Sequence, residues 1–182
     1  MRKLFFAYLF IFINIYINIG ACKLGITPTF VGYIILIAAL RELESESTEF
    51  PRLKPFASAM AVYTGICWVL DIFGIGTTST AGTVIMLILS LISFVVGLYM
   101  LYCVIEGIAD MEDSYGADLG VAGLRSVFKV MVVAEIAAFV LMLIPPVSLI
   151  AMIVVLVATI MLLVRLNATS KAYEDLKWRN VG

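Results

Sequence analysis

Residues 84 to 105 read VIMLILSLISFVVGLYMLYCVI, and they contain no Asp, Glu, Lys or Arg. One helix needs about 20 consecutive apolar residues to cross the hydrocarbon core of a bilayer. This run is therefore long enough to span a membrane. The rest of the chain has the same character, since 63% of its 182 residues are hydrophobic and 14% are charged, against about one half and one quarter in an average soluble domain. The composition excludes a soluble fold and predicts an integral membrane protein.

Five more apolar runs accompany this segment, and each predicts one membrane-spanning helix. They cover about residues 4–19, 28–43, 56–73, 127–144 and, after the Pro145–Pro146 pair, 147–164. Thr27 and Pro28 suit the N-cap and the first helical position of the second helix. We therefore expect an all-α membrane protein with six transmembrane helices, arranged as three antiparallel hairpins in a single domain that covers residues 1–182.

The basic residues predict the orientation of these hairpins, because Lys and Arg in short loops stay on the cytoplasmic side. Eleven of the twelve lie at the N-terminus, around the connections between hairpins or at the C-terminus. Lys23 alone lies on the other side. The count places both termini in the cytoplasm, as an even number of crossings also requires. It predicts a multi-pass protein of the cell membrane, embedded in the lipid bilayer.

Residues 1–22 allow a second interpretation, as a secretory signal. The segment begins with basic MRK, continues with an apolar run and ends in IGAC, which resembles the lipobox of bacterial lipoproteins. That resemblance implies that Cys22 would carry a lipid and become the new N-terminus. The length of the apolar run and its two Asn residues favour a first transmembrane helix instead. Cys67 and Cys103 lie inside apolar runs without C-x-x-C spacing, so we expect small buried side chains and no disulfide or metal site.

Glu135 lies near the middle of the fifth apolar run, with no basic residue at a comparable depth. An ionisable group in the bilayer interior is energetically costly and marks a functional site by default. We expect this carboxyl to be protonated at neutral pH unless a cation is bound. It could thus bind a proton or a cation, or it could donate a structural hydrogen bond to a neighbouring helix. The sequence leaves both alternatives open.

Other polar residues are weaker candidates for binding positions. Asn14 and Asn18 are four residues apart, so a helix would place them on one face, either as a hydrogen-bonded link between helices or as part of a polar pocket. Glu106 begins a row of acids on the extension of the fourth helix that could bind a cation, although a solvated helix face is the simpler explanation. Asp71 and Lys23 are the one acid and the one base expected outside, and they could form a pair there.

Small residues predict where helices pack closely. On the third helix they recur every four residues, as Ala57, Ala61 and Gly65. On the fourth helix they follow a similar pattern, as Ser90, Ser93 and Gly97. Such ladders let a second backbone approach, so we expect both surfaces to face other helices.

The stretch INIGACKLGITPTFVGYIILIAALREL, from Ile17 to Leu43, joins an Asn-containing first helix to a Pro-x-Phe-x-Gly-Tyr segment that opens the second. It resembles a pattern in uncharacterised small bacterial multi-pass membrane proteins. The resemblance covers the first hairpin only, and it implies no activity, ligand or site residue.

Composition and motifs together narrow the function classes. The net charge is -1 and the chain has no His, so nothing attracts nucleic acid and the commonest general base is missing. Without paired carboxylates or a phosphate-binding loop we expect no enzyme and no cofactor. Glu135 and the polar first helix favour a small protein that binds or transports a solute or an ion, or the membrane subunit of a transporter. The alternative is a non-catalytic scaffold, immunity or regulatory subunit that packs against a membrane-protein partner or a second copy of itself.

Overall fold

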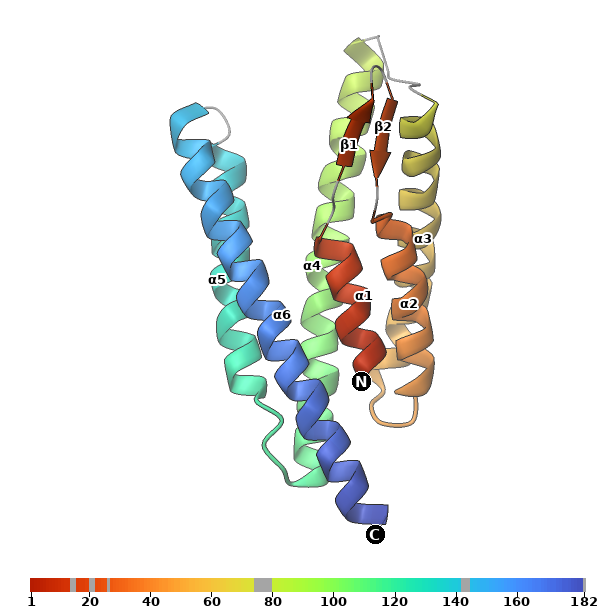
Figure 1. The fold of residues 1–182 in the computed structure, drawn as a ribbon, viewed down its shortest axis with the longest axis vertical. Coiled ribbons are helices and arrows are strands. Elements are labelled where there is room, and N and C mark those ends of the chain that lie inside the picture. Colours follow the sequence, from red (N-terminus) through yellow and green to blue (C-terminus); the bar gives the residue numbers. More distant parts are fainter. Residues whose placement is uncertain (14–15, 20–21, 26, 74–79, 142–144, 182) are drawn as a thin grey trace.

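The computed structural model describes residues 1–13, 16–19, 22–25, 27–73, 80–141 and 145–181. Within these ranges the chain forms six helices and one two-stranded hairpin (Figure 1). The elements are, in order, α1 (Arg2–Phe12), β1 (Tyr16–Ile19), β2 (Cys22–Gly25), α2 (Thr29–Glu42), α3 (Glu49–Ile72), α4 (Thr80–Tyr115), α5 (Val121–Leu141) and α6 (Pro145–Val181). The predicted all-α class is confirmed, with the short hairpin as an addition.

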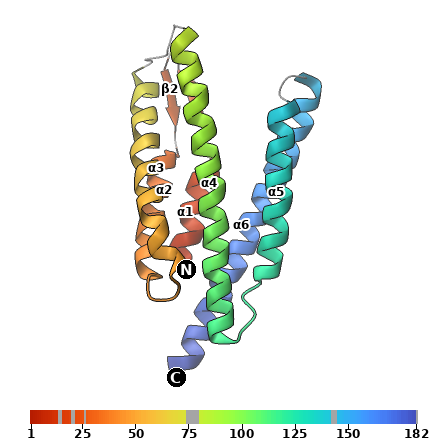
Figure 2. The same ribbon diagram turned by 180° about the vertical axis from the view of Figure 1, so that it is seen from behind.

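The helices form two arms that join near one end of the molecule and diverge toward the other (Figures 1 and 2). In the first arm α1 packs against α2, α2 against α3, and α3 against α4. The second arm is the pair α5 and α6, which meets the first through contacts of α6 with α1 and of α5 with α4. Both chain termini lie toward the joined end (Figure 1).

The buried core lies where the two arms meet. All six helices contribute large, almost fully buried side chains to it, including Leu4, Leu36, Phe50, Ile108, Leu124 and Leu162. Gly107 of α4 makes room for the ring of Phe50, since a Cβ at this position would lie 2.7 Å from two of its carbons. The joined end is therefore the tightly packed part of the fold.

Among the described residues, three helices are long and apolar enough to cross a membrane, namely Glu49–Ile72 in α3, Val84–Tyr115 in α4 and Met152–Trp178 in α6. The most apolar windows of these helices are 11%, 11% and 28% buried. Most of their apolar side chains therefore face outward, which suits lipid rather than water. By contrast, α1 has 11 residues and α2 has 14, too few for a straight crossing. The expectation that runs 4–19 and 28–43 are each one spanning helix is wrong.

The first apolar run changes from helix to strand. α1 ends at Phe12, and β1 then pairs antiparallel with β2, with Asn18 opposite Lys23. The sequence explains this break, because residues 13–19 read INIYINI and alternate Ile with Asn or Tyr, the period of a strand built from β-branched residues. The expectation that Asn14 and Asn18 share a helical face is wrong, since Asn18 lies in β1. Asn14 itself lies outside the described residues.

The base of this hairpin is closed by a side chain. The hydroxyl of Thr27 donates a hydrogen bond to the carbonyl oxygen of Ile13, at 2.6 Å. α2 then begins at Thr29 with Pro28 in the N-cap position, one residue later than the sequence predicts. The hydrogen bond therefore links the chain leaving α1 to the chain that enters α2.

Two helices come close together at a glycine outside the predicted ladder. At Gly32 of α2, a Cβ would lie 2.9 Å from the carbonyl oxygen of Ala7 in α1. On the predicted ladder, Ala57 is fully buried, whereas Gly65 meets Phe30 of α2 at an ordinary 3.8 Å. Close helix packing along the whole ladder on α3 stays a prediction.

Candidate functional site: a cavity between the arms

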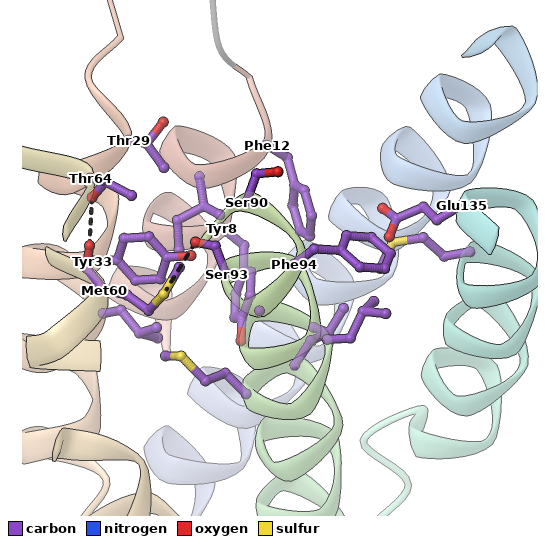
Figure 3. A pocket seen from close by; sticks show the side chains of 17 residues that line it. Tyr8, Phe12, Thr29, Tyr33, Met60, Thr64, Ser90, Ser93, Phe94 and Glu135 are labelled. Carbon is purple, nitrogen blue, oxygen red and sulfur yellow. Dashed lines mark hydrogen bonds between the residues drawn. The ribbon is translucent and has the colours of Figure 1, made fainter. Parts of the chain in front are cut away.

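A cavity with a volume of about 300 Å³ lies among five helices (Figure 3). Its aromatic walls come from α1, α2 and α4, and its polar groups come from α1 to α5. The aromatic residues are Tyr8, Phe12, Tyr33 and Phe94, and the other polar residues are Thr29, Thr64, Ser90, Ser93 and Glu135. This volume is at the lower end of the range for small-molecule sites in proteins, about 300 to 1,000 Å³.

The face of α4 that carries Ser90, Ser93 and Gly97 lines the cavity. Spacings of three and four residues place these side chains on one side of the helix, as the sequence predicts. A Cβ on Gly97 would meet nothing within 4 Å. The expectation of close helix packing is therefore wrong at Gly97, which faces open space, whereas Ser93 contacts Met60 of α3.

Glu135 projects from α5 toward α4, in the direction of Phe94 (Figure 3). It is half-buried, and the structure gives it no ion pair or hydrogen bond among the described residues. No Lys or Arg lines the cavity. The carboxyl thus lies at the wall of a cavity with no protein cation to balance its charge.

Tyr8 is the second polar group without a partner. Its side chain is 2% exposed, and its hydroxyl has no hydrogen-bond partner in the structure. A buried hydroxyl left unsatisfied costs about 1 to 3 kcal/mol. Tyr8 lines the cavity with atoms other than this hydroxyl, whose oxygen is out of reach of a water-sized molecule.

The hydroxyl protons of three other lining residues are already used within the protein. Thr64 donates to the carbonyl oxygen of Met60 at 2.7 Å, Ser90 donates to the carbonyl oxygen of Leu87 at 2.9 Å, and Ser93 donates to the sulfur of Met60 at 3.6 Å. Each hydroxyl oxygen keeps lone pairs that can accept a hydrogen bond. These hydroxyl oxygens and the carboxyl of Glu135 therefore give the cavity several hydrogen-bond acceptors and few free hydrogen-bond donors.

A second cavity of about 410 Å³ adjoins the first. It shares Thr29, Thr64, Ser90 and Ser93 with the first cavity, and it extends to Asp71 near the end of α3. These four polar side chains therefore border both spaces. The two cavities together extend from Asp71, near the end of α3, to Glu135 between the arms.

The structure places the other predicted residues outside the main cavity. Glu106 accepts two hydrogen bonds from the guanidinium of Arg125, at 2.6 and 3.3 Å, and this contact raises the pKa of Arg125 above its usual value. The side chains of Asn18 and Lys23 lie outside the described residues, so a pair between Lys23 and Asp71 stays a prediction. In the part of the chain that the structure describes, no group of three or more metal-ligating side chains occurs.

Sequence reasoning missed Tyr8, Tyr33 and Phe94 as lining residues. Their apolar surroundings in the sequence give no sign that they face a cavity. Ser90 and Ser93 were recognisable by their spacing, but that spacing does not reveal whether a helix or an open space lies opposite.

Comparison of the chain with protein-family models, with curated proteins and with solved structures finds no match. The function must therefore be argued from the cavity itself.

Proposed function

We propose that this protein binds a small solute or ion in the cavity beside Glu135 and carries it across a cell membrane, with the carboxyl exchanging a proton for its ligand. The observation that supports this most is an acid without a protein counter-charge in the wall of a cavity among five helices. In a membrane such a carboxyl is most stable in its neutral form. A cationic ligand can take the place of its proton.

The membrane arrangement in this proposal keeps six crossings. α3, α4 and α6 cross as plain helices, and α5 crosses beside α6. Each of the first two crossings combines a short helix with one strand of the hairpin. The strands extend α1 and α2 toward the level at which α3 ends and α4 begins (Figure 1). Non-helical backbone is tolerated at membrane depth where protein covers it, and β2 packs against α3. Both termini then lie in the cytoplasm.

Transport, rather than binding alone, is supported by the second cavity. Asp71 lies at its far end, and four polar residues connect it with the space beside Glu135. A cation arriving at the outer surface would meet the negative charge of Asp71 first. It would then pass the polar oxygen atoms that border both cavities on its way to Glu135.

A second candidate function is that of a scaffold or regulatory subunit. It is favoured by the exposed apolar side chains at the diverging ends of the arms, including Val84, Leu87, Leu91, Ile150, Met152 and Ile153. A partner helix could pack on them, although lipid would cover them equally well.

The test uses the purified protein in detergent and in vesicles. Glu135→Gln keeps the size and polarity of the neutral acid, so we expect an unchanged fold, loss of the part of the pH dependence of thermal stability that Glu135 contributes, and no proton movement coupled to solute uptake. Asp113→Asn removes an exposed acid far from the cavity and should behave as wild type. Identical pH profiles for wild type and Glu135→Gln would contradict proton exchange at this site.

Glu135→Leu separates binding from structure. If Glu135 serves the cavity, the Leu variant should fold and lose uptake, since the carboxyl has no structural partner among the described residues. A variant that fails to fold would instead assign Glu135 to helix association and support the scaffold function.

A further inference from the structure

We propose that the ligand is a small organic ammonium ion, held with its charge beside Glu135 and its carbon groups against the aromatic walls of the cavity. This inference rests on the proposed function and names its substrate class. It depends on three features of the cavity, namely its charge, its hydrogen-bonding groups and its apolar surface.

The charge and the hydrogen-bonding groups favour a cation. Glu135 is the one acid in the lining, and no base accompanies it. The hydroxyls of Thr64, Ser90 and Ser93 donate to protein atoms and so offer oxygen atoms to the cavity. An anion would meet a carboxylate and few free donors, whereas a cation meets an opposite charge and several oxygen dipoles.

The surface of the cavity favours an organic cation over a metal ion. Ca²⁺ and Mg²⁺ require about six or more oxygen ligands at close range, and a single carboxyl with scattered hydroxyls does not supply them. The walls are instead largely apolar, with rings from α1, α2 and α4 and thioether groups from three helices. Aromatic faces attract an alkylammonium group through cation–π interaction while they bury its carbon atoms.

The exchange balances in charge and in atoms. The O–H bond of the Glu135 carboxyl breaks, its proton leaves to solvent, and the ammonium ion pairs with the resulting carboxylate. The other titratable groups of the lining are Tyr8 of α1 and Tyr33 of α2. α3 and α4 present hydroxyl, thioether and apolar groups there. α6, which packs on α5, has no acid or base between Pro145 and Val164.

The experiment is titration calorimetry on the full chain in detergent, in two buffers of different ionisation enthalpy. The probes are choline, its neutral isostere 3,3-dimethylbutan-1-ol, and sodium chloride. We expect choline to bind with release of about one proton and with an affinity that rises about tenfold per pH unit while Glu135 is protonated, as linkage requires for one exchanged proton. The neutral isostere should bind at least tenfold more weakly.

Variants define which feature recognises the ligand. Glu135→Gln should abolish both the proton release and the pH dependence. Phe94→Leu keeps an apolar wall but removes a ring, so we expect the affinity for choline to fall about two- to fivefold. Phe73→Leu is the matched control, because Phe73 is 70% exposed and lines neither cavity.

The outcomes separate this inference from the proposed function. Binding of sodium that depends on Glu135, or equal binding of choline and its neutral isostere, would overturn the organic cation and leave solute binding at the cavity intact. Absence of choline binding at every pH would overturn the inference as well. Choline binding that persists unchanged in Glu135→Gln would contradict both.

Discussion

Two glutamates, one at the joined end of the molecule and one in the cavity, have opposite surroundings. At the joined end, Glu46 accepts hydrogen bonds from the hydroxyls of Tyr115 and Tyr173, at 2.8 and 2.9 Å. In the cavity, Glu135 has no partner among the described residues. The first carboxylate holds elements together, whereas the second is available to a ligand.

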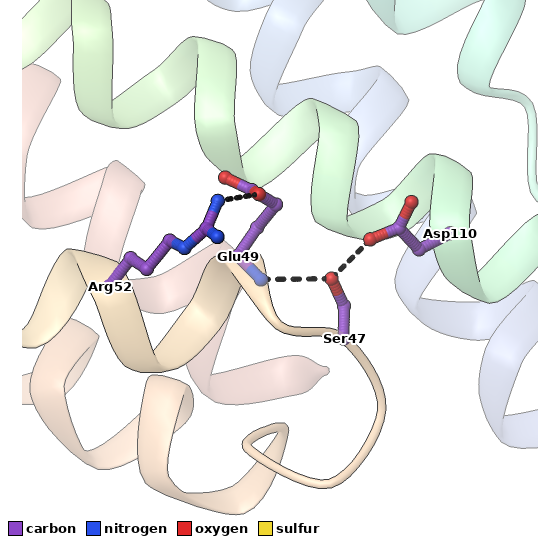
Figure 4. Close-up of polar contacts among 4 residues, drawn as sticks. All are labelled: Ser47, Glu49, Arg52 and Asp110. Carbon is purple, nitrogen blue, oxygen red and sulfur yellow. Dashed lines mark hydrogen bonds and ion pairs between the residues drawn. The ribbon is translucent and has the colours of Figure 1, made fainter.

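The turn between α2 and α3, at the joined end, is held by several hydrogen bonds and an ion pair. Ser47, in the turn after α2, donates to the carboxylate of Asp110 in α4, and its hydroxyl oxygen accepts from the backbone N–H of Glu49 at 3.1 Å (Figure 4). Arg52 pairs with Glu49 one helical turn away, at 2.9 Å. The turn is thus attached both to the start of α3 and to α4. Glu46, Glu49 and Asp110 thus have structural partners, which argues against a cation site at these three acids.

The largest effect on stability should come from Glu46→Ala. The change removes two hydrogen bonds to a charged acceptor, and it leaves the buried hydroxyl of Tyr173 without its acceptor. We expect the free energy of unfolding in detergent to fall by about 2 to 4 kcal/mol. Glu44→Ala is the control, because Glu44 forms an exposed pair with Lys54 that is worth about 0 to 1 kcal/mol. Equal losses of unfolding free energy for both variants would show that the two tyrosine hydrogen bonds of Glu46 do not stabilise the fold more than an exposed ion pair does.

A smaller loss should follow Tyr173→Phe, which removes one hydrogen bond and leaves Glu46 with Tyr115. We expect a decrease of about 1 kcal/mol in the free energy of unfolding. A double variant with Glu46→Ala should lose less than the sum of the two single changes, since both remove the same contact. Additive losses would show that the two side chains do not interact.

Tyr8→Phe should have the opposite sign from Tyr173→Phe. Because its hydroxyl has no partner, its removal should leave the free energy of unfolding unchanged or raise it by up to about 1 kcal/mol. Matched thermal denaturation curves for the two Phe variants provide the measurement. A loss of stability as large as that of Tyr173→Phe would remove the contrast between the two regions.

The smallest effect on stability is expected for Asp71→Asn, since Asp71 is an exposed residue near the end of α3. Its negative charge should attract cations to the second cavity, so the initial rate of uptake into vesicles should fall a few-fold at low ionic strength and converge with wild type at high salt. An unchanged rate at low salt would show that cations reach Glu135 by another route.

The alternation in residues 13–19 is a local sequence signal that distinguishes a strand from a helix. INIYINI has the two-residue period of a strand, and the chain does form β1 within it, at Tyr16–Ile19. Apolar content alone predicts a helix through the same residues. The period of the pattern, rather than its hydrophobicity, is the signal in the sequence that indicates this break.

By itself, the sequence determined the helical class, the apolar segments and the isolated acid at position 135, because these depend on composition and local spacing. Tertiary structure decided the rest. Whether Ser90, Ser93 and Gly97 face a helix or a cavity depends on the divergence of α4 from the second arm, and this in turn depends on core packing at the joined end. Likewise, Glu46 and Glu135 are the same residue type in the sequence. Only long-range folding brings two tyrosines to the first and a cavity to the second.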